Sequence, residues 1–234
     1  MAKKKVGLKV PTANELSKRY GDMIVSASDT KESGLWLPST FFMLNYTFGG
    51  GIPFGKILEV AGEESSGKSL IAYNFAYTTQ QLGGHVIWVD AEQAWMNSWA
   101  QENGVDPNGV TVIRDTRIEN IADALADVAI YWRSQLTHNE PILLVVDSIA
   151  AMDCADNIDS KMVDGKSEMG GRAKALYKFF RIRSELFYKL GITQIYINQL
   201  RIALNVGFGK DNTCLHHDTM IPFVDGTSMK IGDI

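Results

Sequence analysis

A phosphate-binding pattern directly after a short apolar run most constrains how this chain can fold. The run Ile57–Ala61 predicts a buried strand, and the next eight residues fit G-x-x-x-x-G-K-[ST]. These residues, called the phosphate loop below, are Gly62, Glu63, Glu64, Ser65, Ser66, Gly67, Lys68 and Ser69. A strand before the pattern and a helix after it favour a nucleoside triphosphate site over an ordinary glycine-rich turn.

The chemistry of the phosphate loop follows from its residue types. Its glycines let the backbone wrap a triphosphate with successive N–H groups pointing inward, and the following helix adds its positive N-terminal end. Lys68 can reach the β and γ phosphates, and the Ser69 hydroxyl can ligate Mg²⁺. The sequence therefore predicts a bound nucleoside triphosphate with its metal ion.

Composition narrows the class of protein. The 234 residues are 45% apolar and 21% charged, which fits one large globular domain or one with an appendage. No apolar run approaches a membrane span, and the start Met-Ala-Lys-Lys-Lys lacks a secretory core. Two cysteines, Cys154 and Cys214, give no disulfide framework, so we expect a cytoplasmic protein without membrane contact. A net charge of −4 confines any nucleic-acid contact to local patches.

Short apolar segments alternate with helix-like ones from about Leu37 to Asn198. The predicted strands are Lys56–Ala61, Val86–Asp90, Val110–Ile113, Ile142–Asp147 and Gln194–Asn198. The predicted helices are Thr12–Tyr20, Lys68–Gln81, Ala91–Asn103, Ile118–Gln135 and Ser167–Leu190. Strands joined by crossover helices predict an α/β fold with a mostly parallel sheet covered on both faces. Ligands of such folds bind at the carboxyl ends of the strands, where the candidate residues lie.

Three strand ends carry candidate nucleotide-site residues. Asp147 could hold the Mg²⁺ shell opposite Ser69, although apolar strands also end in Asp as a helix cap. Glu92 could position and activate water near the γ-phosphate, and it could equally be an acid that stabilises a helix N-terminus. Gln199 could contact the γ-phosphate and move the glycine-bearing loop that follows it, or merely satisfy backbone groups at the strand end.

Five motifs in one order resemble RecA-type recombinases, the phage relatives of the UvsX kind included. They are Gly50–Lys56, Gly62–Ser69, Asp90–Glu92, Val146–Ser148 and Asn198–Arg201. The resemblance covers roughly residues 37–213 with nearly gapless spacing, which is far more specific than a lone phosphate loop. It implies a RecA-like ATPase core that binds ATP and Mg²⁺.

The same resemblance assigns roles to individual residues. It implies that Lys68 and Ser69 bind ATP and Mg²⁺ and that Asp147 supports the metal shell. It makes Glu92 the base for water and Gln199 the γ-phosphate sensor. Trp99 matches a position where the family stacks an aromatic ring on adenine, although the residue could also be a core or surface-groove tryptophan.

Two loops of the resembled family bind DNA, which predicts single-stranded and double-stranded DNA as partners. The first corresponds to about Asp156–Gly171, and the second begins at Leu200. Met169 and Leu204 match residues that wedge between bases. The nearby cations available for phosphates are Arg172, Lys174, Arg181 and Arg201. Lys174 and Arg181 match cationic family positions, whereas Arg172 is proposed on charge alone, and a charged helix face is usually just solvated.

After Thr213 the resemblance stops, and the sequence from Cys214 to Ile234 resembles the opening block of an intein. Cys214 can attack the carbonyl of Thr213 and convert the amide to a thioester. The alternation around Asp225–Gly226 predicts a hairpin. Only the first intein block is present, so the chain is either the N-terminal precursor of a split intein or a gene fragment. An ordinary hairpin with a free cysteine is the alternative.

These observations predict three parts: an N-terminal oligomerisation segment at 1–36, a partial RecA-like ATPase core at 37–213, and an intein N-terminal fragment at 214–234. The sheet should be incomplete on its C-terminal side and followed by a short β tail. The predicted function is an ATP-dependent, single-stranded-DNA-binding recombinase that acts in strand exchange and repair. We expect it to form a helical filament. We also expect it to be completed by trans-splicing with a complementary C-terminal intein fragment. A helicase or regulatory ATPase of the same core, or a fragment without activity alone, are the alternatives.

Overall fold

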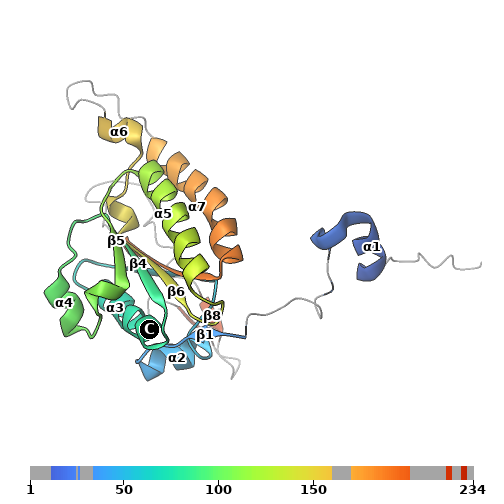
Figure 1. Cartoon of the computed structure of the whole chain (residues 1–234), viewed down its shortest axis with the longest axis horizontal. Helices are drawn as coiled ribbons and strands as arrows, with labels where there is room; N and C mark the ends of the chain where they lie inside the picture. The colour runs from blue at the N-terminus through green and yellow to red at the C-terminus, as the bar shows by residue number, and fades with distance from the viewer. Residues whose placement is uncertain are drawn as a thin grey trace, which may run out of the picture. The chain divides into compact units, whose positions relative to one another are not determined.

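The computed structural model describes residues 12–24, 26, 34–159, 170–200, 220–222 and 228–230. The chain divides into two compact units, Met1–Gly34 and Leu35–Ile234, which are described separately. The first contains helix α1 (Ala13–Tyr20) and the 3₁₀ turn η1 (Gly21–Met23) (Figure 1). Thr12 caps α1 in a capping box, because its backbone N–H donates to Glu15 Oε2 at 2.9 Å while its side chain accepts from the Glu15 backbone. The predicted helix Thr12–Tyr20 is confirmed.

The second unit is built on a five-stranded sheet, and every pairing in it is parallel. The strand order is β3-β7-β6-β4-β5. Their bounds are β3 Ile57–Gly62, β4 His85–Asp90, β5 Val110–Ile113, β6 Ile142–Asp147 and β7 Ile192–Gln199. The α/β fold with a parallel sheet is thus confirmed, and each predicted strand is present. The prediction that β3 is buried is wrong, because β3 is an edge strand whose residues alternate between exposed and half-buried.

Helices cover both faces of this sheet. Helix α3 (Lys68–Gln81) packs on one face, while α5 (Ile118–Gln135) and α7 (Gly171–Lys189) lie side by side on the other (Figure 1). The smaller elements are β1 Trp36–Leu37, α2 Phe42–Phe48, β2 Ile52–Pro53, α4 Asn97–Glu102, η3 Pro107–Gly109, η4 Ile149–Ala151 and α6 Ala155–Asp159. Strands β1 and β2 pair antiparallel.

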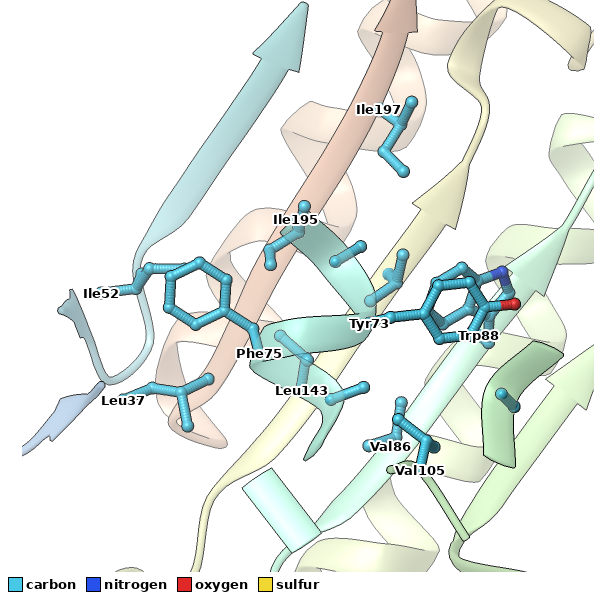
Figure 2. Close-up of a cluster of buried hydrophobic side chains, with 14 of the residues drawn as sticks. Leu37, Ile52, Tyr73, Phe75, Val86, Trp88, Val105, Leu143, Ile195 and Ile197 are labelled. Carbon is cyan, nitrogen blue, oxygen red and sulfur yellow. The ribbon is translucent and has the colours of Figure 1, made fainter. Parts of the chain in front are cut away.

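Alternate residues of each buried strand supply the two hydrophobic cores. Beneath α3, Phe75 and Tyr73 contact the sheet face that carries Trp88, and the Tyr73 and Trp88 ring centroids are 4.6 Å apart (Figure 2). Beneath α5 and α7, Leu125 and Phe187 pack on the opposite face. Fully burying side chains of this size contributes roughly 1.5–3 kcal/mol each, so the sheet is a firm support for its carboxyl edge.

One predicted helix differs in the structure. The sequence predicts a helix over Ala91–Asn103, but α4 begins only at Asn97. The carboxylate of Asp90 accepts hydrogen bonds from the backbone N–H groups of Ala94 and Trp95, at 2.8 and 3.2 Å. These amides are therefore held in a loop, because a short acidic side chain competes with helix formation for nearby backbone donors.

Near the C-terminus, β8 (Met220–Pro222) pairs antiparallel with β9 (Ser228–Lys230), and Ile221 is opposite Met229. This pairing agrees with the hairpin predicted around Asp225–Gly226. The first residues of the predicted helix Ser167–Leu190 precede Gly170 and lie outside the described residues.

Candidate functional site

The phosphate loop leads from β3 into α3 and closes around its own lysine. Gly67, the N-cap of α3, has φ +87°, in the left-handed region that glycine tolerates without penalty. A Cβ on Gly62 would lie only 2.7 Å from Ser66 Oγ, so the loop is packed too tightly there for a side chain. Lys68 is buried and its Nζ donates to the Glu63 carbonyl at 2.5 Å. A loop of this shape presents backbone N–H groups and one cation to an anion.

The sheet register brings the ends of four strands to one edge beside this loop. Gly62 at the end of β3 pairs with Gln199 at the end of β7. Asp90 at the end of β4 pairs with Asp147 at the end of β6. The N–H of Leu200 continues the ladder by donating to the Gly62 carbonyl at 3.0 Å. Residues far apart in the sequence are thus assembled by strand order alone.

Ser69 and Asp147 form the pair that could hold a divalent cation. The Ser69 hydroxyl donates to Asp147 Oδ2 at 2.8 Å. Burial raises the pKa of Asp147 above its ordinary value, and the charges of Glu92 and Asp90 raise it further, while the Ser69 hydrogen bond and Lys68 act in the opposite direction. A hydroxyl beside a poorly solvated carboxylate offers the hard oxygen ligands that Mg²⁺ takes together with phosphates and water. The residues fit that ion.

Glu92 is held between two donors from neighbouring strand ends. The Gln199 side-chain amide donates to Glu92 Oε1 at 2.8 Å, and the hydroxyl of buried Ser148 donates to the same oxygen. Both hydrogen bonds fall on Oε1, and within the described part of the chain Oε2 accepts none. The structure therefore joins two of the predicted site residues directly and adds Ser148, which the sequence analysis had not singled out.

Asp90 is the second residue that sequence reasoning did not assign. It is 2% exposed, and it binds the amides of the loop that carries Glu92. Arg114 Nε lies 3.4 Å from Asp90 Oδ2, and the Arg114 side chain is 61% exposed. The sequence feature that could have indicated both residues is their position, because Asp90 and Ser148 each lie next to or near a predicted site residue at a strand end. Which partner each one binds depends on the fold and could not be predicted.

Helix α4 carries Trp99, which the resemblance assigns to adenine stacking. Its side chain is 45% exposed, so the ring face is accessible. Trp95, four residues before Trp99, is instead packed in the core against Trp88, with ring centroids 5.1 Å apart. The adenine role of Trp99 stays a prediction.

Three of the predicted DNA contacts lie on α7. Lys174 and Arg181 are exposed, whereas Arg172 is half-buried and its Nη2 donates to the Ile149 carbonyl at 3.0 Å. The remaining candidates for DNA contact and splicing lie outside the described residues; they are Met169, Arg201, Leu204, Thr213 and Cys214. The DNA-binding roles stay predictions.

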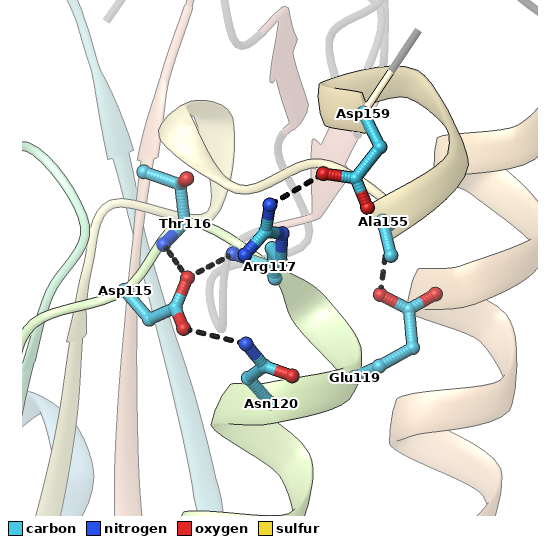
Figure 3. A network of polar contacts seen from close by, with 7 residues as sticks. All are labelled: Asp115, Thr116, Arg117, Glu119, Asn120, Ala155 and Asp159. Atoms are coloured by element: carbon cyan, nitrogen blue, oxygen red, sulfur yellow. Dashed lines mark hydrogen bonds and ion pairs between the residues drawn. The ribbon is translucent and has the colours of Figure 1, made fainter.

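A polar network fixes the start of the first predicted DNA loop (Figure 3). Arg117 Nη2 donates to Asp159 Oδ1 at 2.5 Å, and Glu119 Oε2 accepts from the Ala155 backbone at 3.0 Å. The Asp115 carboxylate accepts a hydrogen bond from the Arg117 backbone N–H at 2.9 Å. Burial raises the pKa of Asp115, but the hydrogen bonds that its carboxylate accepts together lower the pKa below its ordinary value. Helix α6 is thereby tied to the first turn of α5.

No helix within the described ranges is both long enough and apolar enough to cross a bilayer. Over the same residues, no three His, Cys, Asp or Glu side chains gather as a ready-made metal site.

The fold and the site together define a nucleotide-binding α/β protein, with a phosphate loop and its acidic partners at one edge of a parallel sheet. Comparison with known proteins specifies the family. The model of the RecA N-terminal domain matches residues 10–225, and the chain therefore belongs to the RecA family.

Three relatives illustrate the degree of similarity. The chain is 32% identical to Protein RecA of Mycobacterium leprae over 199 residues, which is 85% of this chain and 26% of that protein. It is 31% identical to Protein RecA of Mycoplasma mycoides over 202 residues, or 85% of this chain and 56% of the relative. It is 36% identical to that of Clostridium beijerinckii over 167 residues, or 70% and 43%. The chain spans less than two thirds of the length of each.

Proposed function

We propose that this chain supplies the ATP-binding half of a DNA-dependent ATPase and recombinase, which binds single-stranded DNA and exchanges strands with a homologous duplex. The observation that carries the proposal is the position of Glu92. It follows the end of β4, whose last residue Asp90 pairs with the metal-side Asp147, and it accepts hydrogen bonds from Ser148 and Gln199. Family membership agrees with this reading, because the relatives named above are RecA proteins.

The proposed hydrolysis uses the chain's own groups in fixed roles. The phosphate-loop amides and Lys68 bind the β and γ phosphates of ATP, while Ser69 and Asp147 hold Mg²⁺. The ion supplies positive charge that neutralises the phosphate oxygens. Glu92 orients the attacking water and accepts its proton at Oε2, because Oε1 is occupied by two donors.

Gln199 gives this site a means of reporting nucleotide state. Its side-chain amide now donates to Glu92, and a γ-phosphate within reach would be a stronger, charged acceptor for the same N–H. Gln199 is also the last residue of β7, directly before the segment predicted as the second DNA loop. Exchange of this hydrogen bond is the proposed link between ATP and DNA binding.

The tail carries a separate part of the proposal. Cys214 attacks the Thr213 carbonyl, and the acyl group passes to a hydroxyl or thiol on a complementary intein fragment that carries the rest of the recombinase. The sequence pattern supports this reading, and the β8–β9 pairing is compatible with it. Mixing the chain with a candidate partner and weighing the products tests it. A ligated product that retains Cys214, or unchanged ligation in Cys214→Ala, would contradict the assignment.

Two activity measurements separate the proposed function from its alternatives. ATP-dependent joint-molecule formation by the spliced protein, without directional unwinding of a duplex, is expected of a recombinase. Directional unwinding would instead identify a helicase of the same core. The 234-residue chain alone should show little DNA-stimulated ATP turnover, and strong stimulation of that chain would contradict the need for a second half.

A further inference from the structure

Arg172 connects helix α7 to the strand end that carries the nucleotide site. Its Nη2 donates to the Ile149 carbonyl at 3.0 Å, and Ile149 is the first residue of η4. Ile149 directly follows Ser148, whose hydroxyl donates to Glu92. The guanidinium of Arg172 therefore binds the backbone two residues beyond the metal-side carboxylate Asp147.

The Arg172 side chain packs against the protein and does not extend into solvent as a surface cation would. The side chain is half-buried, and among the described residues its Nε is buried without a hydrogen-bond partner. A buried unpaired N–H is unfavourable, so the rest of the side chain must be held firmly in this position. Lys174 and Arg181 on the same helix are exposed and are better placed to meet DNA phosphates.

The position of Arg172 in the chain suggests a role for its hydrogen bond to Ile149. The first predicted DNA loop, Asp156–Gly171, ends at the residue before Arg172. The other end of that loop is tied to helix α5, where Glu119 accepts a hydrogen bond from the Ala155 backbone (Figure 3). The N-terminal flank of the loop follows Ser148 directly along the chain, and the Arg172 hydrogen bond ties the C-terminal flank to that same backbone at Ile149.

We propose that Arg172 is a positioning residue that transmits the nucleotide state of the site to the first turn of α7. The inference rests on the proposed ATP binding. When ATP with Mg²⁺ engages Ser69 and Asp147, and Gln199 exchanges Glu92 for phosphate, the backbone after Ser148 adjusts. The Ile149 carbonyl moves with it, and Arg172 carries the movement into α7.

Hydrogen–deuterium exchange of the 234-residue chain, with and without Mg²⁺ and a slowly hydrolysed ATP analogue, tests the link. In the wild type, nucleotide should change exchange at residues 149–155 and at 171–176. Arg172→Met should keep the change at 149–155 and lose about two thirds or more of it at 171–176. Its affinity for the analogue should stay within about threefold of wild type, because Arg172 does not contact the phosphate loop.

Two further variants make the result specific. Arg172→Lys retains a donor for the Ile149 carbonyl and should restore most of the response at 171–176. Lys178→Met removes an exposed cation from the same helix and should leave the response intact. If Arg172→Met does not fold, Arg172→Gln replaces it, since its shorter side chain cannot span to the same carbonyl.

The possible outcomes separate failure of the Arg172 proposal from failure of the proposed ATP binding. An unchanged response at 171–176 in Arg172→Met overturns the link. A wild-type chain that binds the analogue without any response at 171–176 also overturns the link and leaves the proposed function intact. A wild-type chain that does not bind the analogue contradicts the proposed function, and the link falls with it.

Discussion

Gln199 Nε2 donates to Glu92 Oε1 at 2.8 Å, so the predicted γ-phosphate sensor and the predicted base are bonded to each other. The two residues are separated by 107 positions in the sequence. Their strands are not neighbours either, because β6 lies between β4 and β7. The contact thus spans the β6 strand end, where Ser148 completes the set of donors. An acid and an amide bonded in this way form an arrangement that a phosphate can disrupt.

Lys68→Ala should abolish tight ATP binding. Lys68 is the cation of the phosphate loop, and among the described residues its Nζ donates only to the Glu63 carbonyl, at 2.5 Å. Without it, the β and γ phosphates lose their central counter-ion, so we expect the affinity to fall about 100-fold or more, roughly 3 kcal/mol. Isothermal titration with an ATP analogue and Mg²⁺ measures this. Lys178→Ala, which removes an exposed lysine from α7, should leave the affinity unchanged.

Ser148→Ala should slow ATP turnover and leave ATP binding nearly intact. The substitution removes one of the two donors to Glu92 Oε1, and a hydrogen bond to a charged group is worth about 1.5–3 kcal/mol. We expect turnover by the proposed spliced protein to fall about 10- to 100-fold, with the analogue affinity within about threefold of wild type. Ser134→Ala, which removes an exposed hydroxyl on α5, is the matched control. An equal fall in affinity and turnover would show that Ser148 does not act through Glu92.

Asp90→Ala should destabilise the fold more than Arg114→Ala does. Asp90 is 2% exposed and accepts from two backbone N–H groups, which its removal would leave unpaired. We expect a loss of about 2–4 kcal/mol in the free energy of unfolding. Arg114 is 61% exposed, so losing its ion pair with Asp90 should cost less than about 1 kcal/mol. Urea unfolding of both variants makes the comparison, and equal losses would show that the amide contacts contribute little.

The free energy of unfolding should decrease as the pH falls from 6.5 to 4, partly through His85. His85 is 5% exposed, stacks on Trp132 and lies 2.8 Å from Thr111 Oγ1 through Nε2. Burial lowers its pKa from 6.5 to about 4. In this window the unfolded chain binds the proton and the folded chain does not, so acid favours unfolding by about 3 kcal/mol at pH 4.

Comparing wild type with His85→Phe isolates this contribution. Phenylalanine can keep the stacking on Trp132 and does not titrate. Urea unfolding at pH 4.5, 5.5 and 7 should show a weaker pH dependence in the variant, by roughly the amount assigned to His85. Identical pH dependence in the two proteins would rule out His85 as the cause.

The sequence was sufficient to predict the strands but not how they are arranged. Runs such as Ile142–Asp147 are apolar throughout, because both faces of a parallel strand are buried, and that pattern is visible without coordinates. The order β3-β7-β6-β4-β5 is set by long-range pairing, so the contact between Glu92 and Gln199 could not be predicted from spacing. The resemblance to recombinases supplied the roles of both residues, not their hydrogen bond.

Competition for backbone N–H groups explains why the start of the helix predicted over Ala91–Asn103 was wrong. Residues from Ala91 onward have helix-like composition, yet Asp90 captures the amides of Ala94 and Trp95, and helix α4 starts at Asn97. Arg172 shows the same limit for side chains. Its charge suggested a DNA phosphate, whereas in the fold it donates to the carbonyl of Ile149, a contact that no sequence pattern indicates.

The measurement that tests the account most directly is ATP binding and turnover in Glu92→Gln. The substitution keeps the size of the side chain and removes the carboxylate that would accept the proton from water. We expect the variant, in the proposed spliced protein, to bind the ATP analogue like wild type, and its single-turnover rate of phosphate release to fall about 100-fold or more. Phosphate release at the wild-type rate would contradict the assignment of Glu92 as the base and, with it, the proposed mechanism.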